Sequence, residues 1–189
     1  MNDIDKILEM AKGFNIIGYE DLPLYDLYLS QVTDFLNDKF DGNFTNNIIQ
    51  NYIKSQIISK PEDGKKRGYT KDHIIQLILL SYMRPILSAE EIKDVFNLAF
   101  NDINISTDDI LTWENTYKIF TELQKESLKN FTEKNKQIKE KLTKIIKENN
   151  INEENFERIF VFLTVLNLIA QASTCKKMAE RIVDDYMKK

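Results

Sequence analysis

Apolar residues recur at helical spacing through most of this 189-residue chain. The pattern is clear over residues 27–40 and 45–54, where each segment has one apolar face and one polar face. Asp41, Gly42 and Asn43 form a predicted turn between them, and Thr45 stands where it can cap the second helix. The pattern predicts two short amphipathic helices joined by a tight turn, with Asn37 among the outward residues of the first.

The outward face of the second predicted helix is almost entirely amide. Its inward positions are apolar, and its outward positions are Asn46, Asn47, Gln50, Asn51 and Lys54. Asn and Gln make paired hydrogen bonds to adenine in the major groove, and Lys reaches phosphate or guanine. This face is therefore a candidate reader of DNA bases. A chain rich in Asn also places amides on any solvated helix face by composition alone, so both interpretations stay open.

A basic segment follows the amide face. Ile57 and Ile58 are predicted to form a short strand, residues 61–64 a turn, and Lys65, Lys66 and Arg67 the outgoing arm of a hairpin that returns to the core at Tyr69. Such a two-stranded wing contacts the DNA backbone beside the recognition helix in winged helix-turn-helix domains. The alternative is an ordinary charged loop.

The next segments complete a predicted head. Residues 74–80 are apolar on most faces and must be buried, behind a cap at Thr70. His73 is placed at the exposed start of this helix and, with no nucleophile or carboxylate pair around it, receives no catalytic role. Ser88 and Glu91 form a capping box for a further helix, after which the head closes near Phe100.

The C-terminal part of the chain, residues 108–189, is predicted to form two long helices. An amphipathic segment runs to Glu148, a turn follows at Asn149 and Asn150, and the last helix is apolar nearly all round in its middle. Only a buried helix is apolar on every side, so either the tail packs on the head or two tails pack together, and we favour dimerisation. Its longest apolar run, residues 159–170, is shorter than the about 20 residues of a membrane span, so no membrane partner is expected.

These patterns predict an all-α chain in three parts, with at most a minimal β-hairpin wing and a C-terminal helical hairpin. Residues 1–21 form an N-terminal helix and connector, residues 22–100 the winged helix-turn-helix head, and residues 108–189 the helical dimerisation or effector region. Only five glycines and three prolines interrupt the chain, in keeping with a mostly helical fold.

Charge is focused rather than spread. The net charge of -4 argues against a protein that coats nucleic acid with an overall basic surface. Between Lys54 and Asp72, however, six basic residues face three acidic ones, so positive charge gathers around the predicted wing. Two of the acids, Glu62 and Asp63, stand within the wing itself.

The chemistry-bearing residues exclude several function classes. The single cysteine, Cys175, forms no intrachain disulfide, and no Cys/His cluster spaced for zinc is present in the sequence. An N-terminus without a basic segment followed by a long apolar one, together with this cysteine usage, favours the cytoplasm. The sequence also lacks G-x-S-x-G, Walker, dinucleotide-binding and H-E-x-x-H motifs. We therefore expect a non-enzymatic protein without a cofactor or a metal.

The order of elements resembles the MerR-like helix-turn-helix head. The run from Leu22 to Phe96 further resembles a bacterial domain-of-unknown-function group, the YkrK-like proteins. The segments that carry this resemblance are LPLYDLYLSQVTDFL, FTNNIIQNYIKSQIISKP and KKRGYTKDHIIQLILLSYMRPILSAEEIKDVF. The MerR-like resemblance implies two sets of contacts with double-stranded DNA. Bases would be read by Asn46, Asn47, Gln50 and Asn51, and phosphates would be held by Tyr52, Lys54, Lys65, Lys66 and Arg67.

Two functions are carried forward. The first is a cytoplasmic transcriptional regulator that binds DNA as a homodimer through the head, with a small-molecule effector left unspecified. The second is a protein-interaction module that keeps the same scaffold without binding DNA. The net negative charge and the acids of the wing favour the second, whereas the basic arm beside the amide face favours the first.

Overall fold

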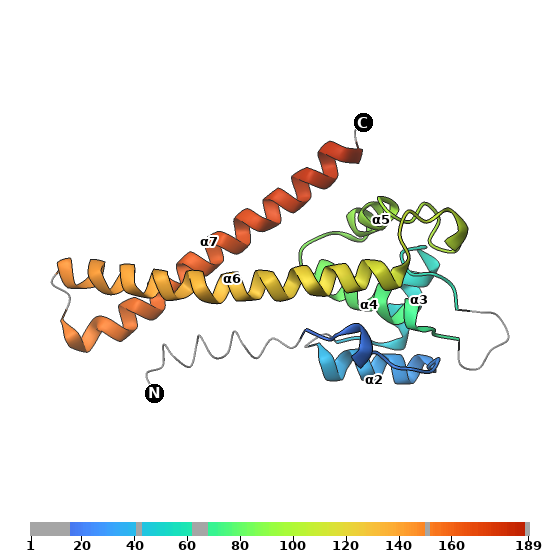
Figure 1. Cartoon of the computed structure of the whole chain (residues 1–189), viewed down its shortest axis with the longest axis horizontal. Coiled ribbons are helices and arrows are strands. Elements are labelled where there is room, and N and C mark those ends of the chain that lie inside the picture. Colours follow the sequence, from blue (N-terminus) through green and yellow to red (C-terminus); the bar gives the residue numbers. More distant parts are fainter. Residues whose placement is uncertain (1–15, 41–42, 62–67, 150–151, 188–189) are drawn as a thin grey trace. The chain divides into compact units, whose positions relative to one another are not determined.

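The computed structural model describes residues 16–40, 43–61, 68–149 and 152–187, and this part of the chain is helical without a strand. The all-α prediction is confirmed. The predicted N-terminal helix lies outside the described residues, as does the basic arm at residues 65–67. The helices are α2 (Leu29–Lys39), α3 (Asn46–Lys54), α4 (Lys71–Met83), α5 (Ala89–Asn97), α6 (Trp113–Glu148) and α7 (Glu153–Met187) (Figure 1).

The chain divides into two compact units. One contains residues 17–121 and the last part of α7 from Glu180, and we call its residues 17–121 the head unit. The other includes residues 122–179, which we call the tail unit. Helix α6 begins in the head unit and continues into the tail unit.

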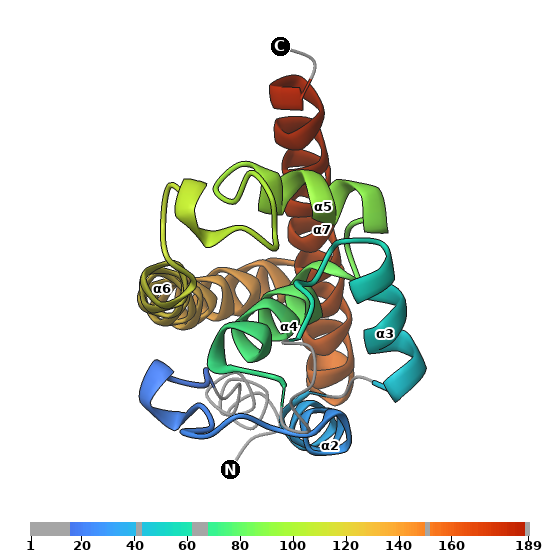
Figure 2. The ribbon, with the colours of Figure 1, turned by 90° about the vertical axis from the view of Figure 1, so that its right-hand side faces the viewer.

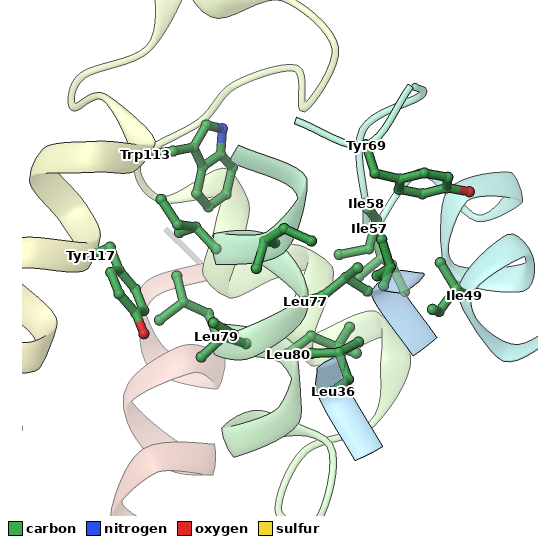
Figure 3. Close-up of a cluster of buried hydrophobic side chains, with 14 of the residues drawn as sticks. Leu36, Ile49, Ile57, Ile58, Tyr69, Leu77, Leu79, Leu80, Trp113 and Tyr117 are labelled. Carbon is green, nitrogen blue, oxygen red and sulfur yellow. The ribbon is translucent and has the colours of Figure 1, made fainter. Parts of the chain in front are cut away.

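Helix α4 is the centre of the head unit. Residues 73–80 are all buried, and Ile75, Leu77 and Leu80 are fully inaccessible. Figure 2 shows α4 between α2 and α5, with α3 alongside, and Figure 3 shows Leu77 and Leu80 within the cluster of apolar side chains. A helix that is apolar on most faces is stable only where neighbours cover it on every side, as the sequence predicted for this segment.

One polar side chain in this central helix is satisfied by the loop after α3. The Gln76 Oε1 atom accepts hydrogen bonds from the Ser59 backbone N–H at 2.9 Å and from the Ser59 hydroxyl at 3.0 Å. A buried amide without partners would cost free energy, whereas here it ties residues 57–60 to α4. The position of α3 is thereby linked to the core.

The first turns of α6 complete the core of the head unit. Trp113 stacks on Phe100, with ring centroids 3.6 Å apart, and meets Phe96 edge to face. The buried hydroxyl of Tyr117 donates a hydrogen bond to the Ile17 carbonyl at 2.8 Å. The core therefore extends beyond Phe100, where the sequence analysis closed the head, because a linker and a new helix bring further aromatic residues back to it.

The segment after α3 forms no strand at Ile57 and Ile58, and this part of the wing prediction is corrected. Gln56 adopts the left-handed conformation with φ of 57°. Its N–H donates to the Ile53 carbonyl, and the Ile57 and Ile58 N–H groups both donate to the Tyr52 carbonyl. This is the Schellman pattern of a helix C-terminus, which turns the two isoleucines into the core, where they are buried.

His73 is buried rather than exposed, which corrects a second expectation. Its Nδ1 atom accepts a hydrogen bond from the Thr70 backbone N–H at 3.1 Å, and its ring meets Tyr69 edge to face. Residues 70 and 73 therefore cap the start of α4 as a pair. His73 thus contributes to the cap of α4 and to the packing of Tyr69.

The tail unit holds the expected pair of long helices, which pack on each other at the ends nearest their connection. Ile146 of α6 and Phe160 of α7 are buried there, with Leu142, Phe156 and Ile159 packed around them. Much of α7 is not covered in this way. Its exposed apolar side chains within the tail unit are Phe162, Val165, Leu166, Ile169 and Met178.

Candidate nucleic-acid interface

Helix α2 holds the turn that leads into α3. The side chain of Asn37 donates to the Phe44 carbonyl at 2.9 Å and accepts from the Phe44 N–H at 2.8 Å. Phe44 is buried, with the Arg84 guanidinium 4.7 Å above its ring. Asn37 is exposed, as expected, and it also joins α2 to the residues before α3 by pairing with both backbone groups of Phe44.

A second side chain of α2 reaches the first residue of α3. The Thr33 hydroxyl lies 2.8 Å from the Asn46 Oδ1 atom and 2.9 Å from the Leu29 carbonyl oxygen. Thr45 caps the same end, since its hydroxyl accepts from the Ile48 N–H at 3.3 Å. Thr33 and Asn37 are one helical turn apart, so α2 holds the start of α3 at two successive points.

The amide face is exposed as predicted. Asn46, Asn47, Gln50, Asn51 and Lys54 are all exposed, whereas Ile49 on the other side of α3 is fully buried (Figure 3). Four of these residues, Asn47, Gln50, Asn51 and Lys54, follow the i, i+3, i+4, i+7 spacing of a single helix face. We call these four the amide stripe.

Tyr52 lies apart from the amide stripe. It is half-buried on the side of α3 that packs against the core, next to Ile53. A phosphate contact by its hydroxyl stays a prediction, but Tyr52 does not share the exposed face of the amide stripe.

The residues directly after the basic arm pair with the segment before α2. The chain returns at Gly68, and Tyr69 pairs with Leu27 in an antiparallel bridge through hydrogen bonds of 2.9 and 3.2 Å. Lys65, Lys66 and Arg67 lie outside the described residues, as do the acids Glu62 and Asp63, so their predicted approach to phosphate stays a prediction. The bridge joins the end of this segment to the residues that precede α2.

Two further lysines lie on or near the segment that follows α3, and neither was among the predicted DNA-binding residues. Lys93 of α5 donates from its Nζ atom to the Gln56 side-chain oxygen at 3.4 Å. The exposed Lys60 follows the buried isoleucines, and its backbone N–H donates to Asn104 at 2.9 Å. Both depend on how α5 and the 102–105 segment pack beside α3, which spacing along the chain does not reveal.

A separate charged cluster lies where Tyr19 meets α4 and α6. The Tyr19 ring has the Lys71 ammonium 4.0 Å and the Lys118 ammonium 4.6 Å from its centre. Lys118 pairs with Glu114, and this hydrogen bond lowers the pKa of the Glu114 carboxyl and raises that of the Lys118 ammonium. These exposed contacts fasten the entry of the head unit to α6.

In the described ranges, the structure contains no group of three or more His, Cys, Asp or Glu side chains that would hold a metal ion. Cys175 is exposed.

The scan against protein families matches residues 17–120 to the family described as Domain of unknown function (DUF1836). The match covers more than half of the chain, and the chain belongs to this family. Its bounds nearly coincide with those of the head unit, residues 17–121. Searches of curated proteins and of solved structures find no match.

Within the described residues, α7 is long and apolar enough to cross a membrane by length and composition. The most apolar 18-residue window within Glu154–Met187 has a mean hydropathy of 1.5, and only 6% of that window is buried. The expectation of no membrane partner rested on the apolar run at residues 159–170, which is shorter than the helix.

Proposed function

We propose that the chain is a transcriptional regulator that binds double-stranded DNA through a MerR-like helix-turn-helix head. The observation that carries the proposal is the amide stripe, an exposed row of hydrogen-bonding side chains on a helix that α2 and α4 hold in place. Side-chain amides of this kind pair with adenine in the major groove, which admits one α-helix.

Phosphate contacts would come from lysine and arginine around the stripe. Lys54 ends the stripe, Lys60 follows it, and Lys65, Lys66 and Arg67 precede the Leu27–Tyr69 bridge. Each phosphate that such a group neutralises releases counterions, so affinity falls as salt rises. This local charge would act despite the net charge of -4.

The salt dependence of DNA binding tests this proposal. Fluorescence anisotropy with labelled genomic fragments is expected to detect binding at low salt that weakens as salt is raised. Changing Lys65, Lys66 and Arg67 together to Ala should weaken binding and flatten the slope of log K against log salt by up to about 3, roughly one for each lost phosphate contact.

The matched control replaces three exposed lysines of α6, namely Lys141, Lys144 and Lys147. It removes the same charge at a distance from the head in the sequence, so it should leave the slope close to that of the unaltered chain. An equal loss in both variants would mean that DNA responds only to total charge. Absence of binding at low salt would remove the regulator and leave the protein-interaction module.

The exposed apolar face of α7 supports a homodimer. Phe162, Val165, Leu166 and Ile169 follow one face of the helix and are between 46% and 59% exposed. An exposed row of large apolar side chains marks an interaction surface, and a second copy of the chain would cover it. A membrane span would instead put Asn167 and Gln171 into hydrocarbon, where an unpaired amide is costly.

The dimer is tested by sedimentation velocity at micromolar concentration. The unaltered chain is expected to be a dimer and Leu166→Glu a monomer, because a buried unpaired carboxylate opposes association. Gln137→Glu adds the same charge at an exposed polar position of α6 and should stay a dimer. A chain that is monomeric alone and cosediments with lipid vesicles would assign α7 to a membrane instead.

A further inference from the structure

The hydrogen bond between Thr33 and Asn46 separates Asn46 from the other amides of α3. We infer that Asn46 sets the position of α3 and that the bases are read by Asn47, Gln50 and Asn51. The inference rests on the proposed function, because it divides the four predicted base readers into one positioning residue and three reading residues.

The first step is the hydrogen-bonding capacity of the Asn46 amide. The Thr33 hydroxyl has one proton and lies 2.8 Å from the Asn46 side chain and 2.9 Å from the Leu29 carbonyl. It either donates to the Asn46 oxygen or donates to Leu29 and accepts from the Asn46 amide nitrogen. In both cases one hydrogen-bonding position of the Asn46 amide is used by Thr33, and the amide is directed toward α2.

A bidentate contact with adenine requires both ends of a side-chain amide. The oxygen accepts from the adenine amino group while the nitrogen donates to the ring nitrogen N7. Each end of the Asn46 amide could make a second hydrogen bond, but the bond with Thr33 turns the amide toward α2. Presenting both ends to a base would require the amide to turn away from Thr33, so binding a base would loosen the helix that presents it. The amides of Asn47, Gln50 and Asn51 carry no such commitment to α2.

The second step is the place of Asn46 on the helix. At 100° per residue, it lies at the edge of the exposed face and closest to the buried side of Ile49 and Ile53, whereas the amide stripe centres about 90° further round the helix. One turn further along α2, the Asn37 side chain makes two hydrogen bonds with the backbone of Phe44. Thr33 and Asn37 together therefore fix both the start and the direction of α3.

A positioning residue and a reading residue differ in what their loss does to DNA selection. If Asn46 positions the helix, its loss weakens binding to all sequences by a similar factor, since every reading side chain is displaced together. If Asn46 reads a base, its loss relaxes the preference at that base alone. Thr33, which is hydrogen-bonded to Asn46, should then behave like Asn46.

The test is selection of binding sites from a pool of random-sequence DNA duplexes by the full chain and its variants. Thr33→Val keeps the shape of the side chain but removes the hydroxyl, and Asn46→Ala removes the other partner. Both are expected to select the same sequences as the unaltered chain, with affinity lowered by roughly two- to tenfold, the effect of one lost hydrogen bond. Asn51→Ala, the control from the stripe, should relax one base position.

Relaxation at one base position by Asn46→Ala, without the same change in Thr33→Val, would overturn the inference while the proposed function stands. Urea unfolding provides a second measurement that needs no DNA. Each single variant should lower the unfolding midpoint, and the double variant should lower it by less than the two shifts together. Additive shifts would contradict the hydrogen bond between Thr33 and Asn46. If the chain selects no duplex but the two shifts are coupled, only the proposed DNA binding is contradicted.

Discussion

Single hydrogen bonds fix the places where the head unit begins and ends. Tyr117 of α6 donates to the carbonyl of Ile17, a hundred residues away in the chain, and burial raises the pKa of its hydroxyl above the ordinary value. A carbonyl at the first residue of the family domain is thus satisfied by a side chain near the last. Loss of this hydrogen bond should therefore lower the free energy of unfolding.

Tyr117→Phe should lower the free energy of unfolding by about 1–2 kcal/mol, because the ring still fills its place while the Ile17 carbonyl loses its buried donor. Denaturation by urea, followed by circular dichroism, measures the change. Tyr25→Phe is the matched control, since Tyr25 is 79% exposed, and it should change the free energy little. An equal effect of the two variants would contradict the assigned hydrogen bond.

The same hydroxyl predicts a dependence on alkaline pH. A folded-state pKa above the unfolded value of 10.0 means that the stabilisation is complete below pH 10.0 and is lost as the pH rises toward the folded-state pKa. Stability should therefore fall above about pH 10 in the unaltered chain. In Tyr117→Phe the fall should be smaller, with Tyr69 still contributing because burial raises its pKa as well.

Residue-level roles could be predicted from spacing only where exposure decided them. The exposed face of α3 followed from the i, i+3, i+4 pattern, because one side of an amphipathic helix must face water. The roles of Thr33 and Asn37 could not be predicted, because a polar side chain that faces outward in a helical projection can still reach the backbone of the next element. His73 was placed outside for the same reason.

At the scale of elements, the helices were predictable and the connection after α3 was not. Adjacent β-branched residues such as Ile57 and Ile58 suit a strand. Here they follow a helix end in which Gln56 takes a left-handed conformation that glycine or asparagine usually adopts. No residue in that segment signals the turn, and the bond between Ser59 and Gln76 needs α4 already in place.

The packing of Trp113 and Tyr117 in the core of the head unit was not predicted, for a related reason. Trp113 and Tyr117 were assigned to the amphipathic segment of the tail, since they follow the linker and share the spacing of the residues after them. Their packing against Phe96, Phe100 and Ile17 depends on contacts between distant parts of the chain. The match to the family, which ends at residue 120, agrees with the extent of this core.

At the scale of the whole molecule, we propose two surfaces with separate roles. Helix α3 of the head unit would read bases, and a second copy of the chain would cover the apolar face of the tail unit. Two heads related by a two-fold axis would bind two half-sites of opposite direction. A dimer also doubles the number of phosphate contacts, which compensates for the modest local charge of one head in a chain of net charge -4.

Nuclease protection of genomic DNA by the full chain, at low salt, tests this account most directly. The account predicts a protected inverted repeat, with half-sites about one helical turn, ~34 Å, apart. Gln50→Ala with Asn51→Ala should abolish protection of that site while weak binding to all DNA persists. Protection that this double variant leaves unchanged, or no protected site at any concentration of the unaltered chain, would contradict the central claim that α3 reads DNA.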